Sequence, residues 1–234
     1  MIKILGSIKN VEEASIVAEY NFDIIDIKNI DDGALGYVGD EQIILISNKI
    51  KKRILSVTAG NQIHPNNYIM INRVELLNSL DIEYIKIGIF DLEYIKEHEL
   101  FLKKIESLNI KKVGVLFADR RLDMNQIMNA CTLSYDGLMI DTIDKSSKCT
   151  FDLLNIDLLN NFVEECHNSN KFCGISGSMT YENIEYAVSL KPDFIGYRGA
   201  LCSSSNRKNL QANKCESIIK KINCANRKMH QEVV

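Results

Sequence analysis

Residues 22–28 have the sequence FDIIDIK, an apolar run that contains an aspartate and ends on a lysine. Isoleucine-rich runs of this length are typical of a buried β-strand. Because side chains alternate between the two faces of a strand, Ile24, Asp26 and Lys28 share one face. Two ionisable groups in so apolar a run are costly to bury unless they are paired or used chemically. Taken alone, the segment favours a structural ion pair over a reactive lysine.

Similar short runs alternate with amphipathic stretches along the rest of the chain. The expected strands cover residues 2–5, 22–28, 53–59, 82–89, 111–117, 136–142, 172–177 and 193–199. The first expected helix begins at Asn10, where Glu13 completes a capping box. The further helices are expected at about 41–52, 68–80, 92–105, 122–132, 156–168, 181–190 and 209–223.

Eight strand–helix units over this length predict an α/β fold, a single-domain (β/α)8 TIM barrel. The alternative is an open doubly wound sheet. That fold would normally carry a glycine-rich dinucleotide-binding turn after the first strand, which Leu5-Gly6-Ser7-Ile8-Lys9 does not provide. We expect the barrel to occupy residues 1–224 and residues 225–234 to form a frayed tail.

Composition excludes several kinds of partner. The 234 residues are 46 % hydrophobic, with 28 basic against 31 acidic side chains and a net charge of −3. Nucleic acid and membranes are therefore not expected partners, and the N-terminus resembles no signal peptide, which predicts a cytoplasmic protein. The seven cysteines form no C-x-x-C pair, so we expect reduced thiols, no metal and no cofactor. We expect His64 in a loop and His98, His167 and His230 in solvent, none of them catalytic.

Polar residues fall at the predicted strand ends, where barrel enzymes place their chemistry. Lys86 interrupts an apolar strand, and Asp141 ends another strand four residues before Lys145. Three lysines and two aspartates would then meet at one rim. Crowding and burial lower a lysine pKa and so release the free amine that a Schiff base needs. The alternative is a pair of structural salt bridges plus a solvated lysine.

The last two expected strands end in small residues. Gly177 and Ser178 follow one strand, and Arg198, Gly199 and Ala200 follow the next. Small residues allow backbone N–H groups to approach an anion, and barrel phosphate sites commonly use these two loops. We expect these five residues to bind a substrate phosphate, with Arg198 less favoured than the backbone donors.

Six motifs carry a family resemblance: DIIDIKN-x3-GALG, SVTAGN, IKIGI, DGLMIDT-x2-K, ISGS and PDFIGYRGALC. These motifs occur in the order and spacing of one family, and the chain resembles the (5-formylfuran-3-yl)methyl phosphate synthase family of methanofuran biosynthesis. The resemblance departs from the family pattern at Ser146-Ser147 and at Gly60-Asn61.

The resemblance implies a (β/α)8 lyase that condenses two molecules of glyceraldehyde 3-phosphate through a lysine Schiff base. It implies that Lys28 forms the Schiff base and that Lys86 accepts a proton. Asp26, Asp141 and Lys145 would support them. Another Schiff-base aldolase and a non-catalytic phosphometabolite-binding barrel remain the alternatives, and the sequence leaves open whether the chain forms a homo-oligomer.

Overall fold

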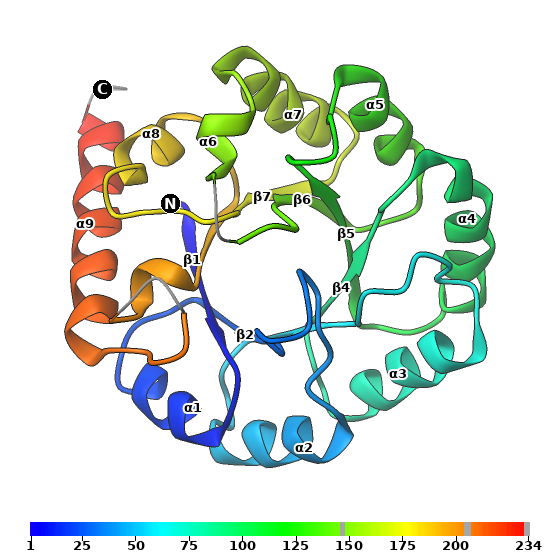
Figure 1. Cartoon of the computed structure of the whole chain (residues 1–234), viewed down its shortest axis with the longest axis horizontal. Coiled ribbons are helices and arrows are strands. Elements are labelled where there is room, and N and C mark those ends of the chain that lie inside the picture. Colours follow the sequence, from blue (N-terminus) through cyan, green and yellow to red (C-terminus); the bar gives the residue numbers. More distant parts are fainter. Residues whose placement is uncertain (146–147, 204–206, 232–234) are drawn as a thin grey trace.

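The computed structural model describes residues 1–145, 148–203 and 207–231. Its eight strands run parallel and close into a barrel in chain order, with β8 paired back onto β1 (Figure 1). This confirms the predicted (β/α)8 fold. The strands are β1 (Lys3–Ile8), β2 (Ile24–Ile27), β3 (Leu55–Thr58), β4 (Tyr84–Gly88), β5 (Lys111–Phe117), β6 (Gly137–Asp141), β7 (Phe172–Ile175) and β8 (Phe194–Tyr197).

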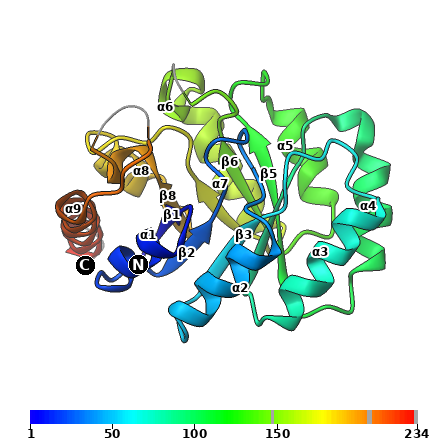
Figure 2. The same ribbon diagram turned by 60° about the horizontal axis from the view of Figure 1, so that its bottom comes forward.

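Helices surround the barrel and cover its outer surface (Figures 1 and 2). Side chains just before several of them accept a hydrogen bond from the first turn, as at Asn10, Asn67, Asp123 and Asn155. The α-helices are α1 (Val11–Ala18), α2 (Asp40–Lys49), α3 (Tyr68–Ser79), α4 (Ile95–Lys104), α5 (Met124–Thr132), α6 (Thr150–Leu153), α7 (Ile156–Asn168), α8 (Ile184–Ser189) and α9 (Ala212–Gln231). Two 3-10 turns are η1 (Leu92–Tyr94) and η2 (Gly199–Leu201). No helix in the described part of the chain is long and apolar enough to cross a membrane.

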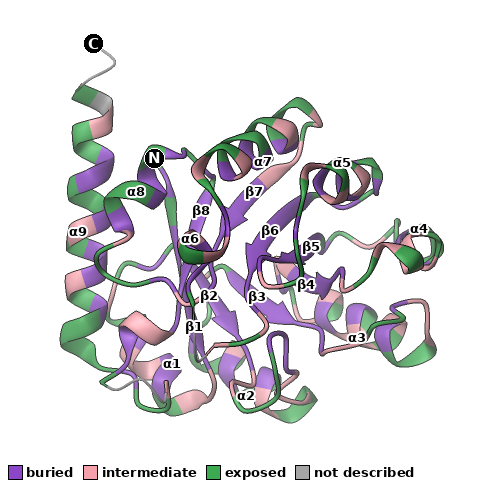
Figure 3. Cartoon of the chain, turned by 45° about the horizontal axis from the view of Figure 1, so that its top comes forward, coloured by how far each residue is buried: buried purple, intermediate pink, exposed green. Residues whose placement is uncertain are grey.

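The alternation of side chains along the strands builds two apolar cores. The larger core lies between the strands and the helices, whose inner faces are buried and outer faces exposed (Figure 3). The smaller core fills the barrel interior and includes Leu5, Ile24, Val113, Met139 and Phe194. The interior also holds the buried polar side chains of Asp26, Ser56 and Lys86.

The C-terminal segment differs from the sequence-based expectation. Helix α9 continues through residues 225–231, where a frayed tail was expected. Its Asn226 is buried, and the side-chain amide accepts from the Ile2 N–H at 3.2 Å and donates to the Ile2 carbonyl at 3.1 Å. This pair of hydrogen bonds attaches the last helix to the start of the first strand.

Two polar side chains also differ from expectation. His98 was expected in solvent but has no exposed surface, and its Nδ1 lies 2.6 Å from the Tyr135 hydroxyl. Asn10 caps α1 as predicted, but the Glu13 carboxylate accepts from the Lys9 N–H at 2.9 Å instead of closing a capping box on Asn10. Glu13 turns inward because it also pairs with Arg198.

Candidate active site

Strand β2 delivers Asp26 into the barrel interior, where it has no exposed surface. Its carboxylate accepts hydrogen bonds from the hydroxyls of Ser7 and Ser56, both at 2.9 Å. Lys86 from β4 completes the set, with its Nζ 2.6 Å from Asp26 Oδ1. The register of the strands explains why the two serines lie beside Asp26, because β1, β2 and β3 align Ser7, Asp26 and Ser56 across the sheet. The two charges of the Asp26–Lys86 pair are thus compensated, and the serines satisfy the carboxylate further.

Lys28, one residue beyond β2, has a different partner from the one its sequence position suggested. The sequence placed Asp26 beside it, but its Nζ lies 3.7 Å from Asp141 Oδ2 at the end of β6. Lys145 binds the other oxygen of the same carboxylate. Asp141 therefore holds two ammonium groups at once, and the Thr142 N–H donates to it at 2.8 Å.

This arrangement shifts the pKa values of all three groups. The pKa of Lys28 is lowered to about 7, chiefly by burial; Asp141 opposes this shift, and the charges of Lys145 and Lys86 add to it. Burial also lowers the pKa of Lys145, against the opposing effect of Asp141. Burial by itself would raise the pKa of Asp141, but the cations of Lys145 and Lys28 hold it well below its usual range. Near neutral pH a substantial fraction of Lys28 is therefore an uncharged amine, which can act as a nucleophile.

The five residues implied as catalytic thus lie together at the carboxyl end of the barrel. A narrow cavity above them is lined by Lys28, Lys86 and Asp141. It shares Lys145 and Gly199 with a larger cavity of about 830 Å³ that extends toward α8 and α9. The larger cavity has room for small phosphorylated molecules, and it adjoins the narrow cavity that Lys28 lines.

The expected phosphate loops line the same cavities. Ser178, Gly199 and Ala200 line the larger one, and Gly177 lines the narrow one. Gly177 has φ of +101°, and a Cβ there would collide with the hydroxyl of Thr150. At Gly199 a Cβ would meet only Arg207 Cγ, at 3.8 Å. Packing therefore accounts for the glycine at 177, whereas a side chain at 199 would have little protein to collide with.

Arg198 is engaged elsewhere. Its Nη2 donates to Glu13 Oε1 at 2.9 Å and to the Arg207 carbonyl at 2.6 Å. Nη1 donates to Glu13 and to the Ser7 carbonyl, and Nε donates to the Arg207 carbonyl. All five N–H groups of the guanidinium have partners, so this side chain has none left for a phosphate. Arg207 lines both cavities, so its guanidinium is better placed than that of Arg198 to contact a phosphate.

Apolar side chains that the sequence analysis did not single out pack into the interior core near the end of β5. Leu35, from the loop after β2, joins the interior core, where the rings of Phe90 and Phe117 stack at 4.8 Å. Asn61 holds this loop, since its Oδ1 accepts from the Leu35 N–H at 2.9 Å and its Nδ2 donates to the Asp32 carbonyl. The departure at Gly60-Asn61 therefore has a structural role, whereas Ser146-Ser147 lies outside the described residues.

The fold and this rim define a class: a (β/α)8 barrel with lysines and carboxylates at the carboxyl ends of its strands, where such barrels carry out catalysis. A family model described as 4-HFC-P synthase matches residues 4–219. The chain belongs to that family, which confirms the resemblance found in the sequence.

Related proteins support the assignment over most of the chain. The (5-formylfuran-3-yl)methyl phosphate synthase of Methanococcus maripaludis strain C5 is 29 % identical, covering 87 % of this chain and 91 % of the relative. The synthase of the same name from Methanocaldococcus jannaschii is also 29 % identical, covering 86 % and 90 %. Among solved structures, 3-hexulose-6-phosphate synthase from Salmonella typhimurium superimposes with a TM-score of 0.67 at 12 % identity, covering 96 % of this chain and all of that one. That likeness concerns the fold.

Proposed function

We propose that this enzyme condenses two molecules of glyceraldehyde 3-phosphate to (5-formylfuran-3-yl)methyl phosphate through an imine on Lys28. The observation that carries the proposal is the Lys28 amine, 3 % exposed and with a pKa of about 7, at the mouth of the barrel in a chain of this family. A free amine attacks an aldehyde carbon, and loss of water leaves an iminium ion. The two trioses supply six carbons, so forming the product releases one inorganic phosphate and two waters in total, because the water lost in forming the imine is taken up again when the imine is hydrolysed.

Asp141 would stabilise the iminium ion. Its carboxylate already lies 3.7 Å from Nζ of Lys28, and its depressed pKa keeps it ionised while the cation forms. Lys145, on the other carboxylate oxygen, would deliver protons to the leaving groups during the eliminations.

Lys86 would remove a proton from the carbon next to the imine. Asp26, whose Oδ1 lies 2.6 Å from the Lys86 Nζ, would hold the ammonium group that forms when Lys86 takes up this proton. Ser7 and Ser56 fix Asp26 in this position. In this scheme Asp26 serves Lys86, whereas Asp141 serves Lys28.

The phosphate that the product retains would lie against the loops after β7 and β8. Backbone N–H groups near Gly177, Ser178, Gly199 and Ala200 are proposed as its donors, with Arg207 adding charge in place of Arg198. Gly199→Val tests this. The fold has room for a side chain at this position, but the side chain would block the approach of the substrate phosphate to the backbone N–H groups. We expect KM for the triose phosphate to rise about tenfold or more, equal to about 1.4 kcal/mol. An unchanged KM would place the phosphate elsewhere.

The direct test is to incubate the protein with glyceraldehyde 3-phosphate alone and to follow furan absorbance. Borohydride added with the triose phosphate should attach mass to the peptide that contains Lys28. A reversible aldol adduct without furan absorbance would favour another Schiff-base aldolase. Binding without any trapped adduct would favour a non-catalytic phosphometabolite-binding barrel.

Lys86→Arg separates the two lysine roles. Arginine keeps the positive charge but stays protonated, so it cannot act as the base. This variant should still give the borohydride-trapped adduct and lose furan production. Lys111→Arg on the surface is the matched control and should behave as the parent protein. Near-normal furan production by Lys86→Arg would mean that Lys86 serves only as a charge.

A further inference from the structure

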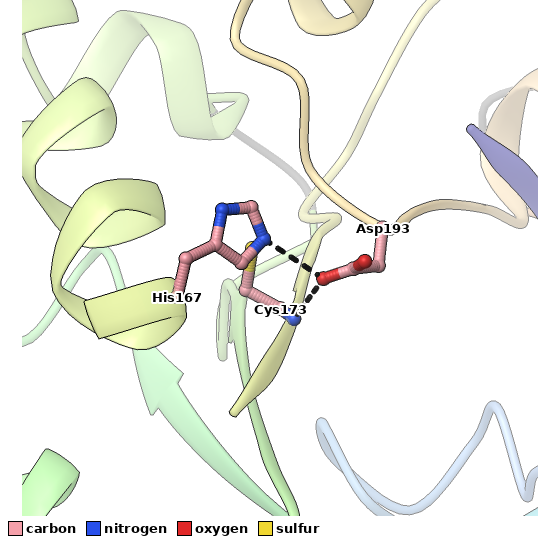
Figure 4. A group of neighbouring side chains, drawn as sticks. All are labelled: His167, Cys173 and Asp193. Atoms are coloured by element: carbon pink, nitrogen blue, oxygen red, sulfur yellow. Dashed lines mark hydrogen bonds and ion pairs between the residues drawn. The ribbon is translucent and has the colours of Figure 1, made fainter. Parts of the chain in front are cut away.

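A second cluster of reactive side chains lies away from the rim. His167 is in the last turn of α7, Cys173 is on β7, and Asp193 directly precedes β8 (Figure 4). They meet at the amino ends of the strands, so the barrel separates them from the candidate active site. The sequence analysis expected no metal site, because the cluster joins residues that are far from any ligand spacing along the chain.

We propose that His167, Cys173 and Asp193 form a zinc site, with water as the fourth ligand. His167 Nε2 lies 3.1 Å from Asp193 Oδ2 and 3.7 Å from Cys173 Sγ. All three ligand atoms are within 4.8 Å of one another. A tetrahedral zinc ion separates a nitrogen from an oxygen ligand by about 3.3 Å and a nitrogen from a sulfur ligand by about 3.5 Å. Two edges of the cluster thus already match the coordination polyhedron, and the exposed histidine and aspartate can close the third.

The backbone holds two of the ligands in place before any metal binds. The Asp193 N–H donates to the Cys173 carbonyl at 2.9 Å, and the Cys173 N–H donates to Asp193 Oδ2 at 2.7 Å. Oδ2 can accept this N–H with one lone pair and offer its second lone pair to the metal. Cys173 is fully buried behind the exposed His167 and Asp193, so the ion would enter from the solvent side.

The set of donors favours zinc among divalent ions. A thiolate, an imidazole nitrogen and a carboxylate oxygen are ligands that zinc accepts together, whereas magnesium and calcium prefer oxygen alone. A plain His167–Asp193 ion pair would not require a thiol on the same side of the histidine. Lys171 donates its Nζ hydrogen bonds to the carbonyls of Leu133 and Tyr135, so these bonds do not occupy the proposed ligands.

Binding has a defined proton balance. Zinc displaces the thiol proton of Cys173, which leaves to solvent, and takes the lone pair of His167 Nε2 while the ring proton sits on Nδ1. The bound ion would join the end of α7 to the β7–β8 pair and so stabilise the amino-terminal face of the barrel.

The test is to titrate the reduced full chain with zinc against a chromophoric chelator, and with cobalt by absorption. We expect a dissociation constant on the order of 1 μM or lower, a thiolate-to-cobalt charge-transfer band, and a higher melting temperature with zinc. Cys173→Ser should remove the band and weaken zinc binding at least about thirtyfold. His167→Ala, at an exposed position that spares the core, should weaken it as much.

Cys224→Ser is the matched control, because this exposed thiol lies on α9, away from the cluster, and its loss should change nothing. The inference is overturned if the parent protein binds zinc no more tightly than His167→Ala. It is equally overturned if the cobalt complex lacks the thiolate band.

Discussion

Asp141→Asn should make the Lys28 amine titrate at a lower pH. The substitution removes a negative charge 3.7 Å from Nζ and frees Lys145, a second cation that opposes protonation of Lys28. At that distance and an effective dielectric constant of about 20, the lost attraction is about 4 kcal/mol, or about three pKa units as an upper bound. We expect the pKa of Lys28 to fall from about 7 by at least about one unit.

Trace acetylation over a range of pH, read peptide by peptide in a mass spectrometer, measures this pKa without substrate. Lys111 is an internal control, since its hydrogen bond with Glu83 raises its pKa and neither group is near the rim. Asp26→Asn is the matched variant and should have a smaller effect, because Asp26 acts on Lys28 more weakly than Asp141 does. A midpoint in Asp141→Asn that is unchanged or higher would refute the assigned pairing.

Three further predictions concern stability. Glu13→Gln leaves the buried Arg198 guanidinium without its counter-charge, so the free energy of unfolding in urea should fall by about 3–5 kcal/mol; a loss under 1 kcal/mol would mean that water screens the pair. Burial lowers the pKa of His98 to about 4, so between pH 6.5 and 4 the unfolded chain takes up a proton that the folded chain does not. Stability should therefore decrease by about 3 kcal/mol as the pH falls through this window, and His98→Gln should flatten the decrease while His64→Gln, at an exposed histidine, should not. Gly177→Ala combines a positive φ with a collision and should cost about 2 kcal/mol or more in a denaturant melt; wild-type stability would show that the loop shifts freely.

Local pattern was enough to predict the barrel, because period-two apolar runs and helix caps depend on neighbours in the chain. The same pattern identified Lys28 and Lys86 as unusual. The pattern could not assign the partners of these lysines. Lys28 pairs with Asp141 because closure of the barrel brings the ends of β2 and β6 together. His98 shows the same limit: its neighbours along the chain are polar, yet tertiary packing buries it against Tyr135.

The charge balance of the rim has a consequence for how substrate arrives. Lys28, Lys86 and Lys145 face Asp26 and Asp141, so a protonated Lys28 leaves one surplus positive charge in a chain whose net charge is −3. That local field, strengthened by Arg207 in the same cavity, steers anions toward the mouth of an otherwise acidic molecule. Steering is strongest while Lys28 is protonated, whereas the proposed imine mechanism requires a neutral Lys28 for nucleophilic attack. Capture of substrate and its activation therefore place opposite demands on one amine, and a pKa close to neutrality serves both.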